Sequence, residues 1–141
     1  MRINNMKNIL FICTHNSARS QMAEGLINHF YSENWKAFSA GTEKTKVKPE
    51  AITVLKEIGA DTSLLYSKKL DKFTNQQFDV VVTVCDSAKE SCPFFPGKKV
   101  IHHSFADPSD VKQPEAKLEA FRKTRDEIKN WLAETLPQLK V

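Results

Sequence analysis

The run FDVVVTV at residues 78–84 is the strongest secondary-structure signal in the chain and constrains the fold most. Unbroken β-branched residues of this length are typical of a strand that is buried on both faces, as in a parallel sheet. Parallel sheets are built from strands that alternate with helices. The segment therefore predicts an α/β fold with an open, mostly parallel sheet flanked by helices.

The hydrophobic pattern of the remaining chain fits this alternation. Further strands are expected at residues 7–12, 36–40 and 99–103, and helices at 21–30, 50–58 and 114–136. Arg125 interrupts the apolar face of the last helix, and we expect it to bury only its aliphatic stem. Ligands of such sheets bind beyond the carboxyl ends of the strands, which is where a functional site is expected.

The length and composition limit the classes of protein to which the chain can belong. A chain of 141 residues fits one domain, residues 1–141, with a single core. The net charge of +4 comes from scattered lysines without interleaved aromatic residues, so no nucleic-acid partner is expected. No apolar run is long enough to span a membrane. Three cysteines without an export signal indicate reactive thiols in the cytoplasm, and we expect a monomer.

The segment CTHNSARS at residues 13–20 has the features of an oxyanion-binding loop. It follows a predicted strand, precedes a helix, and ends near Arg19, whose planar guanidinium suits two oxygens of one anion. Successive backbone N–H groups form an anion-binding concavity, and the same positive field favours a Cys13 thiolate. The residues expected to bind substrate are Thr14, His15, Asn16, Ser17, Ala18, Arg19 and Ser20.

An alternative interpretation is that Cys13 is a structural cysteine buried at the end of a strand. The spacing to Arg19 argues against it. The loop contains no glycine, so neither of the glycine-rich nucleotide-binding patterns is present.

The C-x5-R-S loop together with Asp107-Pro108 resembles the low-molecular-weight tyrosine phosphatase family. The resemblance implies that Cys13 is the nucleophile and that Asp107 is the general acid that protonates the departing oxygen. By itself, an Asp-Pro pair usually marks a turn.

Cys85 and Cys92 go beyond what a phosphatase needs. The segment VTVCDSAKESCPFFP that contains them is similar to thioredoxin-coupled arsenate reductases, which share the phosphatase fold. The resemblance implies that Cys13 attacks arsenate, Cys85 attacks Cys13 to release arsenite, and Cys92 attacks Cys85. Thioredoxin would then supply electrons by reducing the last disulfide, with no bound cofactor.

Formation of that last disulfide implies a movement. In a regular helix the Cα atoms of Cys85 and Cys92 would lie roughly 10 Å apart, whereas a disulfide needs about 4.4 to 6.8 Å. Residues 86–91 are therefore expected to bend or unwind when the two thiols join.

Three alternatives remain open. A zinc site would use Cys85 and Cys92 with His102 or His103, but six residues separate the cysteines, and adjacent strand residues point to opposite faces. A true tyrosine phosphatase commonly has tyrosines after the Asp-Pro pair, where this chain has Ser109, Asp110 and Val111. A non-enzymatic thiol or metal-responsive module would need neither Arg19 nor Asp107.

Some relatives bind potassium beside the loop through an asparagine, a glutamate, a serine and an aspartate. Asn16, Glu24 and Ser39 match the first three. Lys68 stands in the region of the fourth, and its ammonium could replace the ion. We therefore predict no required metal.

Overall fold

The computed structural model describes residues 6–85 and 94–140. Its strands form one sheet in the order β2-β1-β3-β4, and every neighbouring pair is parallel. This confirms the predicted open parallel α/β sheet. The strands are β1 (Lys7–Ile12), β2 (Trp35–Ala40), β3 (Val80–Thr83) and β4 (Lys99–His102).

Strand β3 is shorter than the sequence run that predicts it. Phe78 and Asp79 lie before the strand, and Val84 lies after it. The Asp79 N–H donates to the side-chain oxygen of Asn8 at 2.8 Å, and the Asn8 N–H donates to the Asp79 carboxylate at 2.9 Å. The Asp79 N–H also donates to the Asn8 carbonyl at 3.2 Å, so these side-chain bonds add to the backbone pairing at this end of the strand.

In the described residues, three α-helices connect or follow the strands, as predicted. They are α1 (Arg19–Phe30), α2 (Pro49–Glu57) and α3 (Pro114–Thr135). The described residues also form three short 3-10 helices that the sequence did not predict, namely η1 (Leu70–Phe73), η2 (Pro108–Asp110) and η3 (Leu136–Gln138). Helix α1 begins two residues earlier than expected. The Met22 N–H donates to the carbonyl of Ala18, so helical bonding starts inside the loop itself. Within the described ranges, no helix has both the length and the apolar character needed to cross a membrane.

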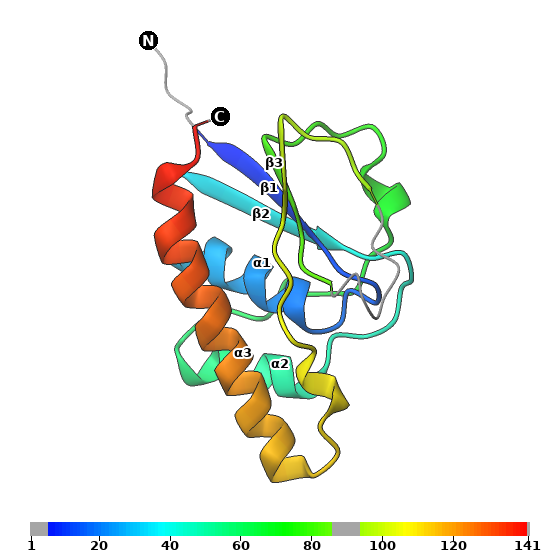
Figure 1. Cartoon of the computed structure of the whole chain (residues 1–141), viewed down its shortest axis with the longest axis vertical. Coiled ribbons are helices and arrows are strands. Elements are labelled where there is room, and N and C mark those ends of the chain that lie inside the picture. Colours follow the sequence, from blue (N-terminus) through cyan, green and yellow to red (C-terminus); the bar gives the residue numbers. More distant parts are fainter. Residues whose placement is uncertain (1–5, 86–93, 141) are drawn as a thin grey trace.

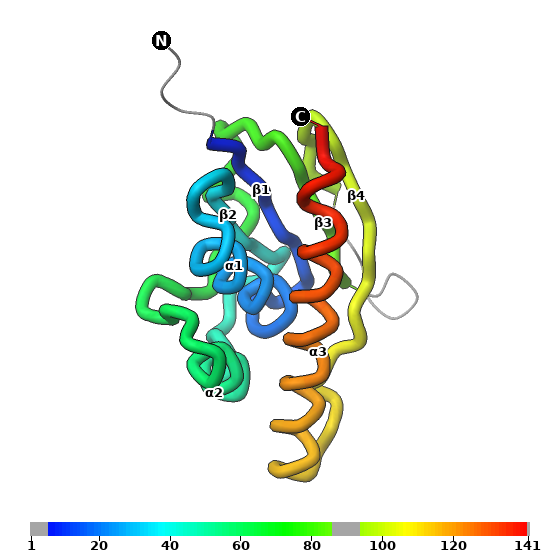
Figure 2. Tube along the Cα trace, turned by 90° about the vertical axis from the view of Figure 1, so that its left-hand side faces the viewer, coloured from blue at the N-terminus to red at the C-terminus, as the bar shows by residue number. Residues whose placement is uncertain are grey.

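The two faces of the sheet pack against different parts of the chain (Figures 1 and 2). Ile9 and Phe11 face the larger cluster, to which the three α-helices contribute. Leu10 and Ile12 face a smaller cluster that includes Phe73 of η1. The alternation along β1 explains why this strand is buried on both sides.

Arg125 departs from the expectation that only its stem is buried. Its Nη1 atom donates to the Val54 carbonyl at 2.8 Å and to the Glu57 carboxylate at 3.0 Å. The guanidinium therefore lies between α2 and α3 and satisfies a carbonyl that would otherwise lack a partner there. The prediction was wrong because a partner on another helix cannot be read from the pattern of one helix.

The register of the sheet brings the ends of three strands together. Ile12 pairs with Ala40 on one side and with Thr83 on the other. The residues that follow, Cys13 after β1 and Gly41 after β2, therefore leave the sheet at the same edge (Figure 1). The Val84 N–H still donates to the Ile12 carbonyl at 2.9 Å, so the chain reaches Cys85 at this edge too.

Gly41 allows two backbone segments to approach closely. A Cβ atom at this position would lie 2.6 Å from the carbonyl oxygen of Thr14 and 2.7 Å from that of Cys13. Both atoms belong to the backbone, which cannot turn aside as a flexible side chain can. Glycine at this position therefore allows the loop after β1 to pack directly against the start of the segment after β2.

We predict that Gly41→Ala displaces the loop of residues 13–20 and lowers the free energy of unfolding by about 1–3 kcal/mol, the usual cost of overpacking. Gly25→Ala is the matched control, because its Cβ would meet the movable end of Leu55 at 3.0 Å, in a helix where alanine is favoured. Urea unfolding of both variants tests this. Equal stability of Gly41→Ala and the wild type would contradict the prediction.

Candidate active site

The loop of residues 13–20 surrounds the Cys13 thiol with hydrogen-bonding groups. Cys13 is 2% exposed, and its sulfur lies 2.8 Å from the Ser20 hydroxyl oxygen. The Asn16 side-chain amide donates to the same oxygen at 2.8 Å. Because Ser20 accepts this bond, its own proton is directed to the sulfur when Cys13 is a thiolate. The Ser20 hydroxyl is therefore placed to donate a hydrogen bond to a Cys13 thiolate.

Asn16 gives the loop its shape. Its φ of 50° is the only positive value at a non-glycine residue in the described part of the chain. Asparagine tolerates this left-handed region better than most residues because its short polar side chain can hydrogen-bond locally. Here that side chain accepts from the Lys68 N–H at 2.8 Å. A turn without glycine thus depends on hydrogen bonds from other segments.

Gln21 supports the loop and was not foreseen from the sequence. Its amide nitrogen lies 3.0 Å from the Asn16 carbonyl oxygen, 2.9 Å from the Asn16 side-chain oxygen and 2.8 Å from the Tyr66 carbonyl oxygen. The sequence pattern assigned Gln21 only a preference for helix. A fully buried glutamine in the first turn of a helix is a signal for such a role, but its burial is visible only in the structure.

The carbonyl groups of the loop are bound from outside. The Glu43 N–H donates to the Thr14 carbonyl at 3.1 Å, the Thr45 hydroxyl to the His15 carbonyl at 3.0 Å, and the Lys48 N–H to the Ser17 carbonyl at 2.8 Å. By contrast, the N–H groups of residues 15–18 donate to no group of the described chain. These donors are therefore available to an anion, and their predicted role in binding one stays a prediction.

Arg19 and Asp107 come together from distant parts of the chain. Arg19 is the first residue of α1 and is 3% exposed. Its Nη1 donates to the Phe105 carbonyl at 3.2 Å, and its Nη2 lies 3.6 Å from the Asp107 carboxylate. The other oxygen of Asp107 accepts from the Ser109 N–H at 2.9 Å, which fixes the carboxyl group at the start of η2. The loop after β4 thus reaches the anion loop.

The second cysteine lies at the same edge of the sheet. Cys85 is fully buried and follows β3, which pairs with β1 in front of Cys13. It is disulfide-bonded, whereas Cys13 is a free thiol. Cys92 and the predicted bending of residues 86–91 lie outside the described residues.

Lys68 lies beside Asn16, Glu24 and Ser39, as its place in the sequence suggested. Its ammonium lies 3.3 Å from the Glu24 carboxylate, which also accepts a hydrogen bond from the Ser39 hydroxyl at 2.6 Å. Burial raises the pKa of the Glu24 carboxyl above its ordinary value, although the Lys68 charge and the Ser39 hydrogen bond oppose this rise. The carboxylate and the ammonium form a buried ion pair behind the loop.

The two histidines considered as zinc ligands have other contacts. His102 shares a 2.6 Å hydrogen bond with the Thr83 hydroxyl. The centre of the His103 ring lies 4.8 Å from the centre of the Phe105 ring and 5.0 Å from the centre of the Trp131 ring. Within residues 6–85 and 94–140, no three His, Cys, Asp or Glu side chains are grouped closely enough to hold a metal ion.

Comparisons with known proteins agree with this geometry. An arsenate reductase of Halalkalibacterium halodurans is 43% identical over 126 residues, which cover 88% of this chain and 91% of the relative. A solved structure described as an arsenate reductase in the phosphate binding state is 27% identical, with a TM-score of 0.76 over 96% of this chain and all of that one. A low molecular weight protein tyrosine phosphatase from T. tengcongensis is also 27% identical, with a TM-score of 0.73 over 94% of this chain and 99% of that one.

The match to a family extends over nearly the whole sequence. Residues 8–141 match the family described as low molecular weight phosphotyrosine protein phosphatase. This range contains the loop of residues 13–20, the three cysteines and Asp107. The chain therefore belongs to the low molecular weight phosphotyrosine protein phosphatase family.

Proposed function

We propose that this protein is an arsenate reductase that uses the thiols of Cys13, Cys85 and Cys92. The observation that carries the proposal is the placement of a second buried cysteine, Cys85, at the end of the strand next to the one that leads to Cys13. A phosphatase has no use for this second thiol. The 43% identity to an arsenate reductase over most of both chains supports the same conclusion.

The loop is suited to arsenate because arsenate is a tetrahedral oxyanion with the shape and charge of phosphate. The N–H groups of residues 15–18 have no acceptor in the described chain, and they directly precede α1, whose N-terminal end favours an anion. Arg19 adds a guanidinium that is already held by Phe105 and Asp107, so little side-chain freedom is lost on binding.

In the first step the Cys13 thiolate attacks arsenic. A sulfur–arsenic bond forms, and one arsenic–oxygen bond breaks. The Asp107 carboxyl group, close to Arg19, donates its proton to the departing hydroxyl group of hydrogen arsenate, which leaves as water. The Ser20 hydroxyl, 2.8 Å from the sulfur, stabilises the thiolate before the attack.

In the second step Cys85 attacks the Cys13 sulfur. A Cys13–Cys85 disulfide forms, and the electrons of the sulfur–arsenic bond remain on arsenic, which leaves as arsenite. Cys92 then attacks Cys85 and frees Cys13.

We further propose that thioredoxin reduces the final disulfide and that the enzyme works in the cytoplasm. Three thiols that must cycle between reduced and oxidised forms need a reducing compartment and a dithiol donor. The overall test is whether arsenate, thioredoxin, thioredoxin reductase and the purified protein together consume NADPH. Consumption that is unchanged when thioredoxin is omitted would exclude it as the reductant.

Phosphatase activity is the second candidate function, because residues 8–141 match the phosphatase family and the T. tengcongensis phosphatase shares the fold. Only Cys13, Arg19 and Asp107 are needed for it. The residues after Asp107-Pro108 are Ser109, Asp110 and Val111, which provide no aromatic ring to stack on a tyrosine. We therefore expect weak hydrolysis of small phosphate esters as a side activity.

Substitution of each cysteine separates the two activities. Cys13→Ser should abolish both arsenate reduction and ester hydrolysis, because both begin at its sulfur. Cys92→Ser should release one arsenite per molecule and then stop as a Cys13–Cys85 disulfide. Cys85→Ser should not complete even one reduction, yet before any exposure to arsenate it should still hydrolyse p-nitrophenyl phosphate. Continuous arsenate turnover by Cys92→Ser with thioredoxin would rule out the three-thiol scheme.

Substitutions at the loop test the proposed acid and anion ligand. Asp107→Asn should lower kcat by about 10²- to 10⁴-fold, the usual contribution of a general acid. Arg19→Lys should lower kcat/KM by about 10²-fold or more, because one ammonium cannot reproduce the planar fork. Asp110→Asn is the matched control, since Asp110 is exposed and contacts neither Arg19 nor Cys13. Near wild-type rates for Asp107→Asn would remove this residue from the mechanism.

A further inference from the structure

Helix α3 and the segment that follows β4 run side by side and enclose a groove between them (Figure 2). The groove has a volume of about 400 Å³. Its walls are residues 103–106 on one side and Glu127, Asn130, Trp131 and Glu134 of α3 on the other. None of these side chains takes part in the reaction proposed above, so the groove calls for its own explanation.

Aromatic rings form much of the inner surface of the groove. The centre of the Trp131 ring lies 5.0 Å from the centre of the His103 ring and 6.1 Å from the centre of the Phe105 ring. Phe105 is buried, whereas Trp131 is only half-buried and His103 is exposed. The two outer rings therefore leave part of their surface open to a ligand. Aromatic surface of this kind accepts aliphatic chains and also attracts cations.

Two carboxylates flank the tryptophan on α3. Glu127 lies four residues before Trp131 and Glu134 three residues after it, a spacing that places all three side chains along one face of the helix. Both glutamates are exposed, and neither forms a salt bridge with any residue that the structure describes. The ammonium of Lys129, between them in the sequence, lies 5.6 Å from the centre of the Phe30 ring instead. The groove thus carries two negative charges that no described cation neutralises.

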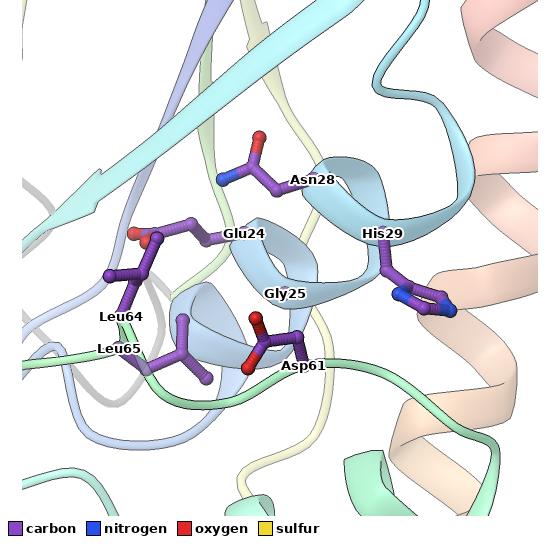
Figure 3. A pocket seen from close by; sticks show the side chains of 7 residues that line it. All are labelled: Glu24, Gly25, Asn28, His29, Asp61, Leu64 and Leu65. Atoms are coloured by element: carbon purple, nitrogen blue, oxygen red, sulfur yellow. The ribbon is translucent and has the colours of Figure 1, made fainter.

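The pocket between α1 and the segment of Asp61 and Leu64 differs in this respect. It also contains two carboxylates, but its volume is only about 100 Å³, and its Glu24 side chain is turned away from Asp61 (Figure 3). Glu24 lies 3.3 Å from the Lys68 ammonium, and Asp61 accepts from the Ser63 N–H at 2.9 Å. Both charges already have partners there, so this smaller pocket does not select a cation.

We propose that the groove between α3 and residues 103–106 binds a linear aliphatic diammonium ion, the chemical class to which the polyamines belong. One ammonium group binds Glu127 and the other binds Glu134, and the aliphatic chain between them lies against Trp131. The Cα atoms of the two glutamates, seven residues apart, are separated by about 10 Å along the helix. A compact ion would have to draw both side chains together, whereas an extended ion reaches both. The site does not depend on the function proposed above.

Titration of ¹⁵N-labelled protein with 1,5-diaminopentane tests the site at low ionic strength, where surface charges are little screened. The indole N–H resonance of Trp131 should shift with saturation. The resonance of Trp35, which is buried and lies outside the groove, should stay in place, and the Trp131→Phe variant assigns the two signals. Pentylamine, with the same chain and one charge, should bind about fivefold more weakly. Magnesium chloride, with two charges and no chain, should cause no saturable shift.

Substitution of the two glutamates tests which groups bind the cation. Glu127→Gln and Glu134→Gln should each weaken the binding of 1,5-diaminopentane by about fivefold, and the double variant by about 20-fold, because each change removes one charge at nearly constant volume. Glu115→Gln is the matched control, since Glu115 is an exposed glutamate in the first turn of the same helix and does not line the groove. An unshifted Trp35 resonance in each variant verifies that the protein is folded.

Three results would overturn the proposal. The first is the absence of a saturable shift of the Trp131 resonance when wild-type protein is titrated with 1,5-diaminopentane. The second is wild-type affinity in the folded double variant, which would place the binding elsewhere. The third is an equal response to pentylamine or magnesium chloride, which would show that the groove recognises positive charge alone and not an extended diammonium ion.

Discussion

The left-handed conformation of Asn16 is the constraint on which the active site depends. The loop turns from β1 into α1 without a glycine, so one residue with a side chain must accept a positive φ. Asn16 accepts it because its side chain has partners on both sides, Lys68 and Gln21 behind the loop and Ser20 within it. The turn, the position of Ser20 and the environment of the Cys13 sulfur are therefore parts of one hydrogen-bond network.

The supports of the loop come from segments that meet only because the sheet is parallel and in register. Gly41 follows β2 and lies against the backbone of Cys13 and Thr14, with no room for a side chain. The Gly41 N–H also donates to the Lys68 carbonyl at 2.9 Å, which ties the segment of the buried lysine to the same edge. Arg19 is held from the other side by the loop that follows β4. A shift of one strand would separate these groups.

The accuracy of the sequence-based predictions depends on how local each signal is. The strands and α-helices are largely correct because periodicity and β-branched residues act over a few neighbouring positions. The errors lie where a distant partner decides. Val54 and Glu57 bury the head group of Arg125, and Tyr66 gives Gln21 its role. None of these partners lies near its contact in the sequence.

The sequence by itself determined the chemical groups and their order. The spacing from Cys13 to Arg19, the cysteine that ends the strongest strand, and the Asp-Pro pair all indicate oxyanion chemistry with thiols. Only the tertiary structure decided which groups meet. Asp107 lies 3.6 Å from Arg19, and Lys68 lies 3.3 Å from Glu24, across long stretches of chain. The physical reason is that a motif specifies local backbone geometry, whereas hydrogen bonds and ion pairs between distant segments depend on how the strands align and which faces are buried.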